Sequence, residues 1–438
     1  MFRKSLIIVL LVLAYYGAGA QTVFRSLEDV WKYADEHNIN IRNSGYELDK
    51  SKYAKTQSYL ALLPTASANG SFTDNTSLQT TLIPAVLFGG PEGVYKPVQF
   101  GQKYIYSAGL SAQLDIVNVQ TWFNLRIAKE TEEFNKASLS NTRKTTYQQI
   151  ATQYYTCILN REAARLSQQC ERVADSIEQS VANKYAQGSV SLANLDVAKI
   201  NKERASQTNT TAQYQEKIAI NNLKGLLNLS AKDSFELETA MQPIENAGAR
   251  PAFTDDPSVR MADYQTKVNM ASLQAAKASF IPTLSVAYSY TTQQNDNKYE
   301  PFQGGPQWFN ANFWTLKASW NILNGGSRWL QMQKSKVNLH ESELQLENAQ
   351  KQSAINDENL WLNYSKASIL VKKAENIMNL SMDNYRHITN KYEAGLASID
   401  DRLTAFNDFI TYQNQYLNSL MDMLVQQYQV KIRQKNFN

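Results

Sequence analysis

Two stretches of this chain, NKYAQGSVS (183–191) and NKYEAGLAS (390–398), are near copies of each other and decide how the sequence folds. They match at five of nine positions with a spacing of 207 residues. Each holds a glycine followed three residues later by a serine. Because glycine often ends a helix and serine often begins one, each copy predicts a tight turn between two antiparallel helices.

Helix-breaking residues are rare on both sides of these turns. Residues 110–241 contain no proline and two glycines, Gly188 and Gly225, and residues 327–438 contain no proline and one glycine, Gly395. As one helix, residues 327–394 would be about 100 Å long. The sequence therefore predicts two long helical hairpins, each with a glycine turn.

The second long helix carries apolar residues at seven-residue intervals. One row consists of Leu330, Val337 and Leu344, another of Met332, Leu339 and Leu346, and a later one of Ile355, Leu362 and Ile369. Two rows need a neighbouring helix on each side. We therefore expect this helix to stand in a ring of helices rather than in an isolated pair.

The internal similarity covers more than the turns. Matches at a spacing of 218 residues pair Arg42, Tyr46, Pro64 and Thr65 with Arg260, Tyr264, Pro282 and Thr283. We expect two structural repeats, 21–240 and 241–438, each with a helix, two strands, a long helix, a glycine turn and a return helix. Residues 1–20 are an expected signal peptide, because basic residues precede an apolar run and a small-residue cleavage pattern.

Four segments alternate between apolar and polar residues. They predict strands at about 65–75, 104–117, 283–293 and 313–323. Strands of about ten residues match a tilted crossing of an outer membrane, although a small soluble antiparallel sheet would alternate as well. Polar positions rich in Ser, Thr, Asn and Gln, and aromatic residues near the strand ends, favour the membrane interpretation.

Four strands are too few to close a barrel, and open sheet edges are not tolerated in lipid. We therefore expect a ring of identical copies that closes the strands and the helices together. The segments between the paired strands, about 75–103 and 294–312, are rich in glycine and proline and are expected to be exposed loops. The expected fold class is mainly α-helical with a membrane β-barrel.

Composition and motifs argue against several functions. The net charge is only +4, and the sequence contains no long run of charges of one sign, so a nucleic-acid partner is not indicated. The three histidines, His37, His340 and His387, lack metal-ligand spacing, and no phosphate loop, nucleophile elbow or HExxH motif occurs. We expect neither an enzyme nor a cofactor nor a metal site. Cys157 and Cys170 lie too far apart along one expected helix to form a disulfide with each other.

Four quoted segments, taken in order, resemble one known family. They are SLEDVWKYADEHNINIRNSGYELDKSKYAKTQSYLALLPTAS (26–67), YAQGSVSLANLD (185–196), WTLKASWNILNGGSRW (314–329) and YEAGLASIDDRL (392–403). Together they resemble the TolC-like outer membrane efflux proteins, the exit ducts of Gram-negative bacteria. The resemblance covers essentially the whole chain after the expected signal peptide.

The resemblance implies a homotrimer. A twelve-stranded β-barrel in the lipid of the outer membrane would continue as a twelve-helix α-barrel across the periplasm. Two partners are also implied, a periplasmic membrane-fusion adaptor protein and an inner-membrane pump. In similar proteins the adaptor docks on the helical turns, which here are Gly188, Ser189 and Val190 in the first copy and Gly395, Leu396 and Ala397 in the second.

Similar proteins close the periplasmic end with polar links near these turns. The expected gate or acidic ring here consists of Tyr392, Asp400, Asp401 and Asn194. This sequence departs from the family pattern, because Asn194 and Thr404 stand where acids are expected and Ala397 where a basic residue is expected. Asp400 and Asp401 also fit a simpler role, since carboxylates in a first helical turn interact favourably with the helix dipole.

The leading hypothesis is a passive trimeric outer-membrane channel of a tripartite efflux or type I secretion system. The alternative is a soluble periplasmic coiled-coil scaffold or adaptor, whose strands would form a small capping sheet. An envelope hydrolase would need a catalytic site, for which the sequence offers no motif. The exported cargo is not encoded in any pattern of this sequence.

Overall fold

The computed structural model describes residues 22–237, 250–253, 255–299, 308–435 and 437, and the expected signal peptide lies outside these residues. The chain divides into two compact units. The helical unit comprises Met1–Asp49, Phe134–Asp263 and Leu346–Asn438, and the sheet unit comprises Lys50–Glu133 and Tyr264–Gln345. Each unit draws on both halves of the chain, so the proposed repeats run through both units.

Helices make up most of the described chain, which confirms the prediction of a mainly helical protein. In order they are α2 (Leu27–His37), α3 (Ile39–Leu60), α4 (Val119–Ala186), α5 (Leu192–Leu226), α6 (Pro257–Ala278), α7 (Ser327–Glu393) and α8 (Ile399–Gln434). The longest, α4 and α7, have 68 and 67 residues. They are uninterrupted because neither contains a proline or a glycine.

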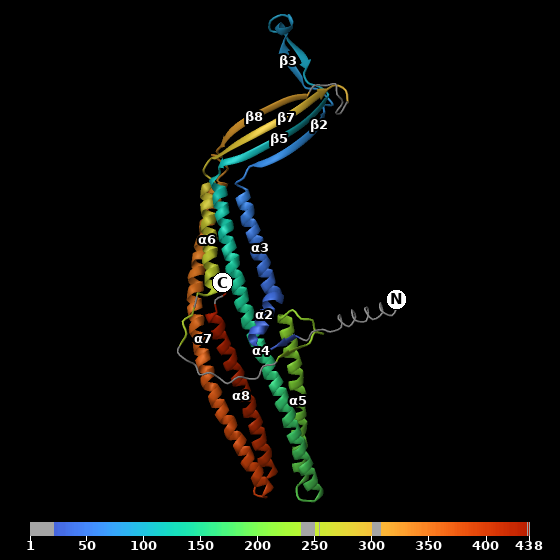
Figure 1. The fold of residues 1–438 in the computed structure, drawn as a ribbon, viewed down its shortest axis with the longest axis vertical. Coiled ribbons are helices and arrows are strands. Elements are labelled where there is room, and N and C mark those ends of the chain that lie inside the picture. The colour runs from blue at the N-terminus through green and yellow to red at the C-terminus, as the bar shows by residue number, and fades with distance from the viewer. Residues whose placement is uncertain (1–21, 238–249, 254, 300–307, 436, 438) are drawn as a thin grey trace, which may run out of the picture. The chain divides into compact units, whose positions relative to one another are not determined.

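Ser191 and Ser398 begin the two return helices, as predicted. The Ser191 hydroxyl accepts a hydrogen bond from the backbone N–H of Asn194, and the Ser398 hydroxyl accepts one from Asp401. Figure 1 shows α4 and α5 as one helical hairpin and α7 and α8 as another, with both turns at the same end of the helical unit.

Four antiparallel strands form the sheet of the sheet unit, in the order β2-β5-β7-β8. Their bounds are β2 Thr65–Asp74, β5 Tyr104–Val117, β7 Thr283–Asp296 and β8 Trp308–Ser319. The fourth strand differs from its expected range of 313–323, because it starts at Trp308 and ends at Ser319. The end of β8 is set by the neighbouring strand β7, because Ser319 pairs with Thr283, the first residue of β7. The residue before Thr283 is Pro282, which has no N–H with which to continue the ladder.

The register places most apolar positions of the four strands on one face, although Phe309 and Phe313 of β8 lie on the other, opposite Gln293 and Ser289. Ala68, Leu110 and Tyr290 are neighbours across the sheet, and one step along, Ala112, Tyr288 and Trp314 are neighbours. Between these two rows, Ser67, Ser111 and Ser289 lie side by side on the other face, and the Ser67 and Ser111 hydroxyls are 2.8 Å apart. The sheet therefore has one apolar and one mainly polar face.

Two further pairs of strands were not expected from the sequence. β1 (Thr22–Phe24) pairs in parallel with β6 (Phe235–Leu237) in the helical unit. Within the expected loop 75–103, β3 (Thr80–Pro84) and β4 (Tyr95–Gln99) form an antiparallel hairpin, joined through a 3₁₀ turn at Ala85–Phe88. Pro84 and Pro97 hid this hairpin, because proline normally argues against a strand.

The core of the helical unit is rich in aromatic residues. The Trp31 ring stacks on the Tyr147 ring at 4.9 Å, and Trp31 Nε1 donates a hydrogen bond to the Tyr147 carbonyl. Around this pair pack buried residues of α2, α4, α5, α7 and α8, including Ile150, Leu223 and Met423. This core fixes helices that lie far apart in the sequence against one another.

A buried ion network lies in the same unit. Lys144 donates to the Asp256 carboxylate at 2.5 Å, and Arg433 binds Asp357 through two hydrogen bonds of 2.7 and 2.9 Å. The Arg433 Nε atom is also 3.6 Å from Asp256. The network thus ties together α4, the start of α6, α7 and the end of α8.

The two apolar rows of α7 differ in exposure. Met332 and Leu339 are half-buried within the sheet unit, whereas Leu330, Val337 and Leu344 are 60%, 66% and 55% exposed. One face therefore packs inside the chain and the other lacks a cover from the described residues. None of the helices described here is long and apolar enough to cross a membrane.

Candidate functional site at the helical turns

The two copies of the repeated phrase form the same backbone turn. Gly188 and Gly395 have φ angles of +71° and +75°, a conformation that favours glycine. Each glycine N–H bonds to the carbonyl of the tyrosine three residues before it, and the next N–H bonds back to the preceding lysine carbonyl. This pattern is a Schellman motif, which ends a helix by satisfying its last carbonyls.

The turn residues differ in how far they reach into solvent. Gly188, Ser189 and Gly395 are exposed, and Leu396 is 78% exposed. Val190 and Ala397 are half-buried and pack against an apolar cluster beneath the turns. Of the six expected docking residues, four are thus exposed and two are half-buried and also support the hairpins.

The apolar cluster joins the two helical hairpins. Its buried members are Ile177, Val181, Leu195, Ala198, Tyr392, Ile399, Leu403 and Phe406. They come from α4, α5, α7 and α8, so each hairpin contributes both of its helices. The two turns of one chain are therefore held together by packing.

Tyr392 is the expected gate residue that the structure embeds most deeply. Its side chain is 8% exposed, and its hydroxyl accepts a 2.9 Å hydrogen bond from Lys184 Nζ. The same ammonium lies 4.1 Å from the centre of the Tyr392 ring, and the Arg402 guanidinium lies 5.2 Å from it. Two cations thus contact one aromatic ring, an arrangement stabilised by the negative face of the ring.

The expected acidic residues of the gate differ in their contacts. Asp401 accepts hydrogen bonds from the Ser398 backbone N–H and hydroxyl at 2.9 and 2.7 Å, which forms a capping box at the start of α8. These two bonds lower the pKa of the Asp401 carboxyl. Asp400 is exposed in the same turn, and Asn194 contacts Ser191 in the matching turn of α5. No hydrogen bond joins Tyr392 to these residues within the described chain.

Lys184 and Arg402 were not expected from the sequence as site residues. Lys184 belongs to the repeated phrase, and its counterpart Lys391 in the second copy is exposed. The repeated phrase itself could have pointed to Lys184, because each copy places a lysine directly before a tyrosine. Which lysine contacts which tyrosine depends on how the hairpins pack, and the sequence does not specify that.

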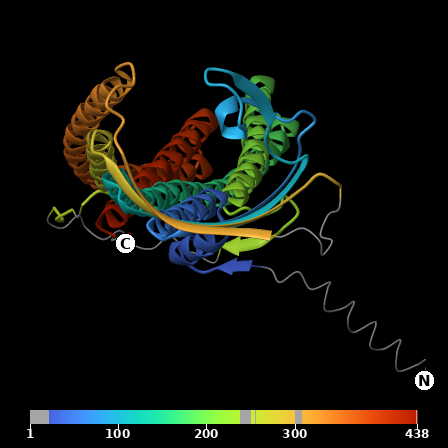
Figure 2. The same cartoon turned by 90° about the horizontal axis from the view of Figure 1, so that it is seen from above.

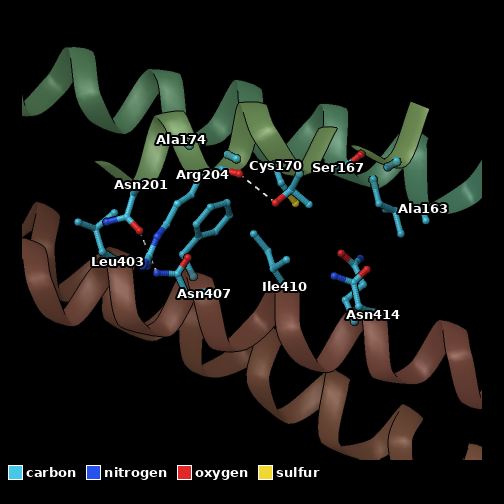
Figure 3. A pocket seen from close by; sticks show the side chains of 16 residues that line it. Ala163, Ser167, Cys170, Ala174, Asn201, Arg204, Leu403, Asn407, Ile410 and Asn414 are labelled. Atoms are coloured by element: carbon cyan, nitrogen blue, oxygen red, sulfur yellow. Dashed lines mark hydrogen bonds between the residues drawn. The ribbon is translucent and has the colours of Figure 1, made fainter. Parts of the chain in front are cut away.

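A cavity of about 170 Å³ lies within the helical unit between the first hairpin and α8. Figure 3 shows small and polar side chains of α4 and α5, such as Ala174 and Asn201, facing Leu403, Asn407 and Ile410 of α8. The Asn407 amide donates to Asn201 Oδ1 at 3.3 Å. The two hairpins are therefore packed closely near the turns and less closely at the level of this cavity, which lies farther along the helices.

The described residues provide neither a metal-ligand cluster nor an activated thiol. Among the described residues no cluster of His, Cys, Asp or Glu could hold a metal ion. Cys157 and Cys170 are free thiols, and burial raises their pKa values to about 12 and about 11. Such thiols are protonated near neutral pH and are poor nucleophiles.

The fold is that of bacterial outer membrane channels. The Vibrio cholerae outer membrane protein VceC shares 14% identity at a TM-score of 0.77, with 94% of this chain and 97% of that chain covered. The Campylobacter jejuni CmeC channel shares 14% identity at 0.74, covering 93% and 85%. The open state of the Neisseria gonorrhoeae MtrE channel shares 17% at 0.74, covering 93% and 88%. No curated protein matches this sequence.

The sequence also matches a family model directly. The model of the outer membrane efflux protein family matches residues 32–229 and 251–431, and the chain belongs to this family. The family consists of efflux channels of the Gram-negative outer membrane that extend into the periplasm, and it is not an enzyme family. The resemblance, the localisation and the efflux function predicted from the sequence are thereby confirmed.

Proposed function

We propose that three copies of this chain form a passive exit duct, with a twelve-stranded β-barrel in the outer membrane and a twelve-helix α-barrel in the periplasm. One observation carries the proposal: in the described chain, β2 and β8 each pair with one strand only. Every residue of β2 and β8 is exposed. An isolated sheet with two such edges is not stable in lipid, because the unpaired backbone N–H and C=O groups of the edges find no hydrogen-bond partners there.

Strand direction supports closure by copies of the same chain. All neighbours in the order β2-β5-β7-β8 are antiparallel, so β8 of one copy would also run antiparallel to β2 of the next. Three copies of four strands give twelve. The apolar face of the sheet would meet lipid, and the face with Ser67, Ser111 and Ser289 would line a wet lumen.

Exposed apolar residues on the helices support the same assembly. Ile355, Leu362 and Ile369 of α7 are 53%, 54% and 57% exposed, although they keep a seven-residue spacing. On α5, Tyr214 and Ile218 are 62% and 50% exposed. Rows of this kind need a helix from a neighbouring copy, because exposed apolar stripes are unfavourable in water.

The turns are the proposed docking points for a periplasmic adaptor, which would connect the duct to an inner-membrane pump. Each chain presents two turns with the same Schellman geometry, so a trimer would present six near-equivalent points. Gly188, Ser189, Gly395 and Leu396 are the accessible residues. Docking there would leave the helical core beneath the turns intact.

We also propose that the periplasmic end is gated at Tyr392. Its contact with Lys184 links the first and second hairpins of one chain, and its contact with Arg402 joins α7 to α8 within the second hairpin. Asp400 and Asp401 would add an acidic ring around the threefold axis. The energy for transport would come from the pump, because the chain offers no nucleotide-binding motif.

Membrane fractionation tests the proposal. The protein should sediment with outer membranes and should be released only by detergent. A variant with charged residues at Leu110 and Tyr290, on the apolar face of the sheet, should fail to insert, since charges on a lipid-facing strand cost about 2–4 kcal/mol each near the midplane. Recovery of the unaltered chain in the soluble periplasm would contradict the proposal.

A further inference from the structure

The hairpin between β2 and β5 carries an exposed apolar tip. Its 3₁₀ turn, Ala85–Phe88, leaves Val86, Leu87 and Phe88 52%, 72% and 58% exposed. On the adjoining strands, Leu82 and Tyr95 are 65% and 60% exposed. Contiguous exposed apolar surface on a structured element usually marks an interaction site.

The tip is held in one shape by its own hydrogen bonds. The Ala85 N–H bonds to the Val94 carbonyl at 2.7 Å, and the Gly90 N–H bonds to the Ala85 carbonyl at 2.9 Å. Ala85 is buried beneath the turn, and Gly89 has a φ angle of +73°. The apolar side chains are therefore displayed on a preformed turn, which lowers the ordering cost of a contact.

The base of the hairpin is fixed to the main sheet. The Asn75 N–H bonds to the Lys103 carbonyl at 2.7 Å, and the Asn75 amide donates to the Gln102 carbonyl at 2.9 Å. The Lys103 N–H in turn bonds to Asn297 Oδ1, just beyond β7, at 3.2 Å. The hairpin thus continues from the sheet through three hydrogen bonds.

The hairpin lies on the concave side of the curved sheet, as Figure 2 shows. In a sheet that closes into a barrel, the concave side faces the barrel axis. The tip then points away from lipid. Its composition agrees, because residues 80–99 contain one acidic residue, Glu92, and one basic residue, Lys96, and so lack the cluster of basic residues that would favour anionic headgroups.

We infer that the apolar tips of three copies meet on the threefold axis and close the outer mouth of the duct. The occupant of each exposed tip is therefore a second copy of this chain. The inference rests on the proposed trimer, and it adds a second closure to the one proposed near the helical turns. Burying Leu87 and Phe88 among their symmetry mates removes apolar surface that a single chain leaves in water.

Disulfide formation at the tip tests the inference. Leu87→Cys is placed in a chain with Cys157→Ser and Cys170→Ser, and the matched control carries Thr80→Cys at the exposed base of the same hairpin. After mild oxidation of the purified protein in detergent, we expect about two-thirds of the Leu87→Cys chains in a linked dimer, because three thiols on one axis form one disulfide. The control should stay unlinked.

Two other results would overturn the inference, and they are distinguishable. Trimers by light scattering without linked dimers would remove the closure and leave the proposed duct standing. Absence of trimers would remove both. A bimane label on the thiol of the Leu87→Cys variant adds a check, since a blue-shifted emission that depends on lipid nanodiscs would place the tip in the membrane and contradict contact between copies.

Discussion

Lys184 of the first helical hairpin donates a 2.9 Å hydrogen bond to the hydroxyl of Tyr392 in the second, and its ammonium also contacts the face of the same ring. The two residues are 208 positions apart. Each belongs to one copy of the repeated phrase, so the duplication supplies both halves of the link. A separation of the hairpins must break this contact.

Loss of this link should make the duct conduct more readily. Lys184→Met removes the hydrogen bond and the cation–π contact, which together contribute about 1–2 kcal/mol per chain. Tyr392→Phe removes the hydrogen bond alone and should have a smaller effect. We expect single-channel conductance in planar bilayers to rise in the order wild type, Tyr392→Phe, Lys184→Met.

Lys391→Met is the matched control for the gate, because Lys391 occupies the same place in the second phrase and is exposed. It should conduct like the wild type. Equal conductance of all four proteins would mean that the contact between Lys184 and Tyr392 does not restrict the pore.

The glycine turns should be needed for export. Gly188→Val with Gly395→Val places β-branched residues at positive φ, at a cost of more than about 1 kcal/mol per turn. We expect export to be lost while trimers persist. Export is measured with a compound that accumulates in a deletion strain relative to the wild type.

Gly225→Val is the control for the turn variants, since Gly225 has open space around it and does not have a positive φ. It should export normally. Leu396→Asp changes only an exposed side chain of the turn and should weaken adaptor binding. Undiminished export by the double glycine variant would refute docking at the turns.

The buried ion network predicts how the helical unit responds to acid. Burial alone would raise the pKa of Asp256, but hydrogen bonds from Lys144 and Ser258 outweigh it and hold the pKa below its ordinary value. A lowered folded-state pKa stabilises the fold above the unfolded value, and this contribution is lost as pH falls through the folded value. Asp256→Asn should therefore destabilise by about 3–5 kcal/mol at pH 7.

Thermal unfolding followed by circular dichroism between pH 2 and pH 7 measures this effect. The difference between the wild type and Asp256→Asn should shrink below about pH 4. Asp383→Asn, which breaks an exposed pair with Arg386, should change stability by less than about 1 kcal/mol. A difference that is constant with pH would show that Asp256 is not stabilising as a carboxylate.

Both cysteines should resist labelling. With a pKa of about 11, Cys170 should react with maleimide at pH 7 about a hundredfold more slowly than an ordinary thiol, and Cys157, at about 12, more slowly still. The labelling rate should rise with pH. Ser189→Cys at an exposed turn is the fast control, and equal rates at all three positions would contradict the burial of the native thiols.

Local patterns made much of the fold predictable. Proline-free tracts and the caps Ser191 and Ser398 are encoded in short stretches of sequence, and so is strand alternation. The end of β8 at Ser319 was not predictable, because it depends on the partner strand beginning after Pro282. The β3–β4 hairpin was missed because two prolines obscure its pattern.

The site was less predictable than the fold. The turn glycines follow from the repeated phrase, whereas the partner of Tyr392 follows from the packing of two hairpins. Sequence reasoning looked for acids near this tyrosine, and the structure places Lys184 and Arg402 there. Asp401 is engaged by Ser398 instead, so its role in a gate remains a proposal.

The mass of the purified protein in detergent is the most direct test of the account, in which one chain supplies a third of a closed cylinder. Light scattering corrected for bound detergent should give about three times the mass of one chain, which is 49.6 kDa with the expected signal peptide included. A folded monomer that is stable in detergent-free buffer would contradict it.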